Sequence, residues 1–241
     1  MPGKLDIGKI VFGAFIVPWR NRYAFVRTLW IPLLALTAVS LLWGHLDEPF
    51  RGRVVWALYA VYWLLFVLFA VTCHRLVLLD AAAVSFRSLP SWSWRETRFA
   101  LLLGAVGVIC IVVMLGAATF FVNVPGVATA SSGELEWIKY LAVIPAYYVF
   151  ARMSLVLPAT AVDRKVDLKW AWRSTKTNGW RLVLVVGVLP WVVSEAIGLI
   201  YRSEPTVFET LIVSLLTYTL MVVEIAALSL SYRQLTENDA A

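Results

Sequence analysis

Long apolar runs dominate the chain, and the charged positions are grouped between them. Segments 28–46, 54–73 and 99–133 contain no Asp, Glu, Lys or Arg. Crossing the hydrocarbon core of a bilayer as a helix takes about 20 mostly apolar residues. The pattern therefore predicts an all-α integral membrane bundle. We expect its transmembrane helices at 27–45, 54–75, 98–122, 137–158, 181–202 and 207–231.

The overall composition supports this interpretation. Of the 241 residues, 61% are hydrophobic and only 15% are charged, whereas a soluble domain carries about 25% charged residues. The apolar stretch 10–17 is short and lacks a small-x-small cleavage site, so we do not expect a cleaved signal peptide. We predict one membrane domain over 1–241, in which 1–26 form a cytoplasmic amphipathic segment.

The distribution of Lys and Arg predicts the orientation in the membrane. Seventeen of the 21 basic residues fall on the side of the predicted membrane that holds both termini, and four fall on the other side: Arg51, Arg53, Lys139 and Arg202. The positive-inside rule therefore places both termini in the cytoplasm. The net charge of +6 then reflects topology, with contact to anionic lipid headgroups as a consequence. Because these bases adjoin span ends, we expect no binding to nucleic acid.

A six-residue pattern, Trp-x-Trp-Arg-x-Thr, occurs at 92–97 and again 78 positions later at 170–175. A weaker copy lies at 19–25. Trp rings favour headgroup depth, and Arg side chains extend toward phosphates. We expect each hexamer to open a membrane helix from the cytoplasmic side. We also expect short cytoplasmic helices that lie in the interface, with Asp167 and Ser91 as their caps. The candidate contacts with lipid or a partner are Trp19, Arg20, Trp92, Trp94, Arg95, Trp170, Trp172 and Arg173. General membrane anchoring and a specific lipid-binding site are both open interpretations.

The hexamers also predict an internal repeat. Each of the two stronger copies follows a span with a similar end, at 74–84 and 152–162. The predicted units are 54–122 and 137–202, with a third unit split between 207–235 and 5–45. The arrangement would be a parallel repeat of helical hairpins, with pseudo-three-fold symmetry about the membrane normal.

Three ionisable residues fall inside predicted spans: Arg152, Glu195 and Glu224. Such residues are costly in a bilayer and usually face the bundle interior with a partner. At about 1.5 Å per residue, Arg152 and Glu224 lie at similar depth, so we predict an intramembrane charged pair. It would be either a structural ion pair or part of a substrate or proton site. Glu195 is a second intramembrane acid, within reach of Arg202 or Lys139.

Catalytic signatures are lacking in these 241 residues. His45 and His74 are predicted on opposite sides of the membrane, which excludes a shared haem or metal. The sequence contains no HExxH, GxSxG or P-loop motif and no spaced cysteine motif. Cys73 and Cys110 are expected to be small apolar packing residues. We therefore expect a protein that is not an enzyme and has no cofactor or metal.

Segment 152–184 resembles a group of poorly characterised bacterial multi-pass membrane proteins. The group includes the membrane domain attached to some glycerophosphodiester phosphodiesterases. The matching residues are Arg152, Leu155, Pro158, Ala159, Asp163, Trp172, Arg173, Asn178 and Trp180. The resemblance implies a bacterial inner-membrane protein. It transfers no activity, because the sequence contains no phosphodiesterase barrel.

Two functional classes remain open. The first is a non-catalytic accessory subunit, assembly factor or scaffold that binds membrane lipids and other membrane proteins. The second is a small transporter or lipid-translocating protein that uses the Arg152 and Glu224 region. The spans offer little polar lining for a solute path, and Trp-rich segments suit docking at headgroup level. These observations favour the first class, and the sequence leaves the oligomeric state open.

Overall fold

The computed structural model describes residues 4–46, 48–79, 92–123, 132–199 and 206–240. These residues form an all-helical structure with no strand among them. Six helical segments are long and apolar enough to cross a membrane: 22–45, 52–78, 94–121, 141–161, 179–198 and 207–237. Each overlaps one predicted span, so the prediction of an all-α protein with six membrane-spanning segments is confirmed.

The helices are as follows, in chain order. They are α1 (Ile7–Arg20), α2 (Arg22–His45), α3 (Glu48–Leu78), α4 (Trp94–Val122), α5 (Ser132–Met153), α6 (Val156–Ala161), α7 (Leu168–Ser174), α8 (Gly179–Leu182), the π-helical segment η2 (Val183–Val188), α9 (Leu189–Gly198) and α10 (Val207–Ala240). The fourth span joins α5 and α6, and the fifth joins α8, η2 and α9. Pro190 lies at the start of α9 and has no backbone N–H, so it cannot donate a hydrogen bond to the carbonyl one turn earlier. The π-helical segment η2 ends just before this proline.

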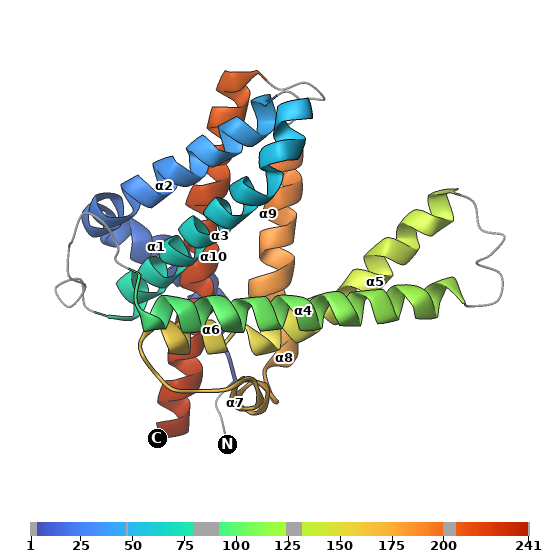
Figure 1. Cartoon of the computed structure of the whole chain (residues 1–241). Coiled ribbons are helices and arrows are strands. Elements are labelled where there is room, and N and C mark those ends of the chain that lie inside the picture. Colours follow the sequence, from blue (N-terminus) through green and yellow to red (C-terminus); the bar gives the residue numbers. More distant parts are fainter. Residues whose placement is uncertain (1–3, 47, 80–91, 124–131, 200–205, 241) are drawn as a thin grey trace.

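The helices diverge from a common base (Figure 1). Helices α2, α3 and α10 pack together, while α4 and α5 pack along each other and project away from α9 and α10. Helix α1 packs against α10 and lies above this base in the view. The short helices α6, α7 and α8 lie at the base, near both ends of the chain. We call this base, with the adjoining ends of α3, α4, α5 and α10, the helix junction.

The helix junction holds several of the best-buried large apolar side chains. Leu5, Phe99, Leu155, Leu182 and Leu235 are almost fully enclosed there. By contrast, α4 leaves large apolar side chains uncovered along most of its length: Leu101, Val108, Ile111, Val112, Leu115 and Phe120. An uncovered apolar surface of this extent suits lipid or another membrane protein rather than water.

Helix α1 occupies most of the predicted amphipathic segment. Its N-cap is Asp6, whose carboxylate accepts the backbone N–H of Lys9. The helix packs against α10 and buries Ile10 and Ala14, while Phe12 and Trp19 remain exposed. It therefore has one face on the protein and large apolar side chains on its free surface, as a helix lying at a bilayer interface has.

The two hexamers occupy different places in the helices. The first opens α4, where Ser93 and Glu96 form a capping box and Trp94 is the first helical residue. The second lies inside α7, which Asp167 caps, and the following span begins only at Gly179. The prediction that each hexamer opens a span is thus correct for the first copy and wrong for the second. The difference arises because Asp167 starts a separate helix before the hexamer.

Candidate functional site: the arginine-rich helix junction

Arg152 is the most enclosed arginine of the junction and lies in the last turn of α5, 6% exposed. Its guanidinium donates to the Thr175 hydroxyl at 3.0 Å, to the Tyr148 hydroxyl at 3.3 Å and to the Trp172 carbonyl. The guanidinium carbon also lies 3.7 Å from the centre of the Trp172 ring. Neutral acceptors and an aromatic face therefore hold this cation in place.

The predicted pair of Arg152 and Glu224 is not formed. Within the described part of the chain no ion pair or hydrogen bond joins them, and Glu224 is half-buried on α10. Helix α10 packs mainly against α1, α2 and α3, whereas Arg152 turns toward α7. Similar depth allows two charges to meet, but the order of helices around the bundle decides whether they do.

Glu195 lies on α9 with an exposed side chain. Of its two predicted partners, Arg202 lies outside the described residues. Lys139 belongs to α5, but its side chain is likewise outside what the structure describes. The proposed contact of Glu195 with either cation therefore stays a prediction.

Asp163 connects three elements of the junction. Arg75 from α3 and Arg95 from α4 contact its carboxylate at 3.2 and 3.1 Å. Asp163 follows the C-cap of α6 with φ +63°, a left-handed conformation unusual for a residue other than glycine. The backbone N–H groups of Asp163 and Arg164 donate to Thr160 and Ala159, which gives the hydrogen-bond pattern of a Schellman motif.

Several arginines donate to backbone carbonyls that secondary structure leaves without a partner. Arg75 donates to Ala161 at the end of α6, and Arg233 donates to Val77 at the end of α3. Arg98 donates to Val166 just before α7. The last carbonyls of a helix have no partner within the helix, so these guanidinium groups satisfy acceptors and attract the negative end of the helix dipole. Sequence reasoning used the same arginines only as topology signals and missed this structural role.

Asn178 fixes the N-terminal segment to the junction. Its side-chain oxygen accepts the backbone N–H of Leu5 at 2.9 Å, while Arg181 donates to the Leu5 carbonyl at 2.8 Å. Asn178 is 1% exposed and Leu5 is 2% exposed. Next to it, a Cβ on Gly179 would come within 3.0 Å of the Tyr148 hydroxyl and 3.3 Å of Arg152, so the close approach of α8 to α5 requires glycine.

The two histidines contact distant parts of α10. Buried His74 shares a hydrogen bond of 2.7 Å with Ser229, and its ring lies beside Phe99. His45 contacts the Thr210 hydroxyl at 3.2 Å. Ser229 and Thr210 are separated by 19 residues of helix, or about 28 Å. The described residues contain no group of three potential metal ligands.

The predicted interfacial residues divide into two groups. Six have exposed side chains: Trp19, Arg20, Trp92, Trp94, Trp172 and Arg173. The other two are partly buried in the junction, Arg95 against Asp163 and Trp170 against Tyr232 and Arg164. A shared sequence pattern therefore does not give a shared environment, because α4 and α7 present their hexamers to different neighbours.

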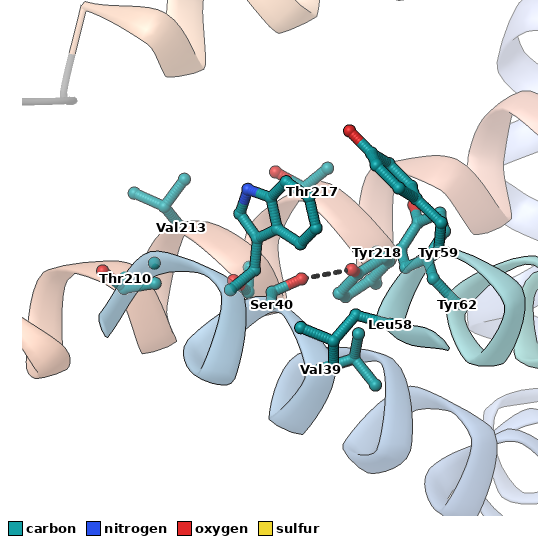
Figure 2. A pocket seen from close by; sticks show the side chains of 12 residues that line it. Val39, Ser40, Leu58, Tyr59, Tyr62, Thr210, Val213, Thr217 and Tyr218 are labelled. Carbon is teal, nitrogen blue, oxygen red and sulfur yellow. Dashed lines mark hydrogen bonds between the residues drawn. The ribbon is translucent and has the colours of Figure 1, made fainter. Parts of the chain in front are cut away.

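A second candidate region is a cavity of about 380 Å³ between α2, α3 and α10. Figure 2 shows Ser40 and Tyr218 hydrogen-bonded to each other in its lining, with oxygen atoms 2.6 Å apart. Hydroxyl-bearing side chains dominate its polar lining: Ser40, Tyr59, Tyr62, Thr210, Ser214, Thr217 and Tyr218. Its described lining contains no charged residue. Sequence reasoning missed this cavity, although Thr210, Ser214, Thr217 and Tyr218 share one helical face.

We compared the chain with protein-family models, with curated proteins and with solved structures, and none of them matches.

Proposed function

We propose that the protein is a non-catalytic accessory subunit, assembly factor or scaffold of a bacterial cytoplasmic membrane. It would act by binding lipids and other membrane proteins. The observation that carries the proposal is the contrast between the two ends of α4. Its first turn is fixed in the junction through Arg95, which binds Asp163 and pairs with Glu96 of the same helix, whereas its later turns present uncovered apolar side chains.

This contrast suits a protein that holds a partner. The arginines of the junction bind Asp163, hydroxyl groups and backbone carbonyls, and so make a stable base. Helices α4 and α5 extend from that base and offer a long apolar surface within the membrane. Helices in lipid associate through van der Waals packing of such surfaces and through hydrogen bonds. The proposal places the junction and both termini on the cytoplasmic side.

Site-specific photocrosslinking in native membranes tests this proposal. A photoreactive residue at Val112, 63% exposed on α4, should give one discrete protein adduct that is also formed from Val108, 60% exposed on the same helix. The matched control is Leu42, which is 51% exposed on α2 and lies on a different part of the bundle. Adducts with lipid alone at Val108 and Val112, or the same adduct from all three positions, would contradict a partner surface on α4.

The hydroxyl-lined cavity supports a second candidate, a small transporter or lipid-translocating protein. Hydroxyl groups both donate and accept hydrogen bonds, so this lining suits an uncharged polar group. A path through this cavity would not need the Arg152 and Glu224 region. Under this candidate, Thr217→Val and Ser40→Ala should abolish uptake in reconstituted vesicles while thermal unfolding stays close to wild type.

A further inference from the structure

A second cavity, of about 520 Å³, lies between α4, α5 and α7. Its walls are almost entirely apolar, yet two cations line it. The lining comes from Ile109 and Val113 on α4, Val149 and Met153 on α5, and Leu168, Lys169, Trp172 and Arg173 on α7. This volume falls within the range of about 300–1,000 Å³ that is typical of small-molecule sites.

The two cations are held close together on α7. They are four residues apart and share one helical face, and the Arg173 guanidinium donates to the Lys169 carbonyl at 3.4 Å. Both side chains are exposed, and neither forms an ion pair within the described ranges. Asp167, the acid that caps α7, accepts the Trp170 backbone N–H at 2.7 Å.

Trp172 belongs both to the lining of this cavity and to the surroundings of the buried cation of the junction. It lines the cavity, and Arg152 lies 3.7 Å from its ring centre. Arg152 is in turn held by Thr175 and Tyr148. Trp172 is therefore held in place, and a third positive charge lies next to its ring. An occupant of this site must combine a long apolar part with a negative group.

We propose that this cavity is a binding site for a phospholipid with a net negative headgroup. An acyl chain lies along Ile109, Val113 and Val149, and Lys169 and Arg173 bind the headgroup phosphate. A zwitterionic headgroup brings its own cation next to these two side chains, so a headgroup of the phosphatidylglycerol type binds more tightly. The inference rests on the membrane location in the proposed function and specifies its lipid-binding part.

The test measures binding of two lipids with identical acyl chains to the delipidated, full-length protein in detergent. Native mass spectrometry and thermal unfolding should both show preferential binding of phosphatidylglycerol over phosphatidylcholine. Lys169→Gln with Arg173→Gln removes two basic residues next to the anionic headgroup and should weaken phosphatidylglycerol binding by about 30-fold. The matched control is Lys165→Gln with Lys176→Gln, which removes two exposed cations outside the cavity lining and should keep the preference.

A further variant tests the apolar part. Val113→Trp fills the cavity and should weaken binding of both lipids, while soluble glycerol phosphate should not compete in the wild type. Equal binding of the two lipids, or an equal loss in the control pair, would overturn the site.

The crosslinks at Val108 and Val112 do not depend on these cations. Their persistence beside a failed lipid preference would overturn this inference alone, whereas their absence beside an intact preference would overturn only the partner surface.

Discussion

At the scale of single residues, Arg152 shows how a cation in a membrane-spanning segment is satisfied without a carboxylate. Burying a charge is costly unless hydrogen bonds and other favourable contacts replace its hydration. Here Tyr148, Trp172 and Thr175 together supply three acceptors and an aromatic face. Because these neutral groups satisfy the guanidinium, Arg152 does not need Glu224 as a partner.

Removing the acid should therefore have little effect on stability, and removing the cation a large one. We expect Glu224→Gln to leave thermal unfolding in detergent within error of wild type. Arg152→Met should destabilise by about 1–3 kcal/mol, because it leaves enclosed acceptors unsatisfied. Arg152→Lys, which keeps the charge but not the planar fork, should be intermediate. Equal destabilisation by Glu224→Gln and Arg152→Met would mean that the two residues are coupled.

Asp163 allows the backbone and charge contributions to be separated. Its side chain is 61% exposed, so its ion pairs with Arg75 and Arg95 are partly screened. Asp163→Ala removes the charge and keeps the left-handed strain, and should cost about 1–2 kcal/mol. Asp163→Gly removes both the charge and the strain, so it should lower the stability by less than half as much in the same thermal unfolding assay. A larger loss for glycine than for alanine would show that φ +63° is not a strained conformation here.

At the scale of elements, the sequence predicted the features that depend on the length of an apolar run. It did not predict the contacts that depend on which elements lie next to each other. The spans could be predicted because a bilayer demands about 20 apolar residues whatever the helix packs against. Asp167 could be predicted as the N-cap of a short helix, and it does cap α7, but the sequence did not show that this helix contains the second hexamer and ends before the next span. The neutral partners of Arg152 and the hydroxyls around Tyr218 come from several elements, so spacing within one helix could not reveal them.

The attachment of α1 to the junction gives a prediction at this scale. Asn178→Ala leaves the enclosed Leu5 backbone N–H without its acceptor, which costs about 1–3 kcal/mol. We expect the loss to appear mainly as local opening, with faster amide hydrogen exchange in α1 and unchanged exchange in α4. Lys176→Ala, an exposed neighbour in sequence, is the control and should leave both helices as in wild type. Faster exchange in α4 would show that Asn178 supports the whole junction.

At the scale of the whole molecule, the helix junction combines two properties. It gathers the bases that the positive-inside rule counts. It also uses Arg75 and Arg233 to bind helix-end carbonyls and Arg98 to bind the carbonyl of Val166 just before α7. Orientation in the membrane and cohesion of the helices thus depend on the same side chains. A protein inserted with the junction outside would have to translocate this whole cluster of bases.

Cysteine accessibility in intact cells tests the orientation directly. Cys73 and Cys110 are free and are first replaced by alanine, after which single cysteines are introduced at Ser131 and Asp239. Ser131 belongs to the loop 123–136 between the third and fourth predicted spans, which the predicted orientation places in the periplasm. It lies outside the described residues. We expect a membrane-impermeant maleimide to label the cysteine at Ser131 in intact cells and the cysteine at Asp239 only after lysis, because the charge distribution keeps both termini in the cytoplasm. Labelling in the reverse order would place the helix junction outside and remove the cytoplasmic orientation on which the proposed function depends.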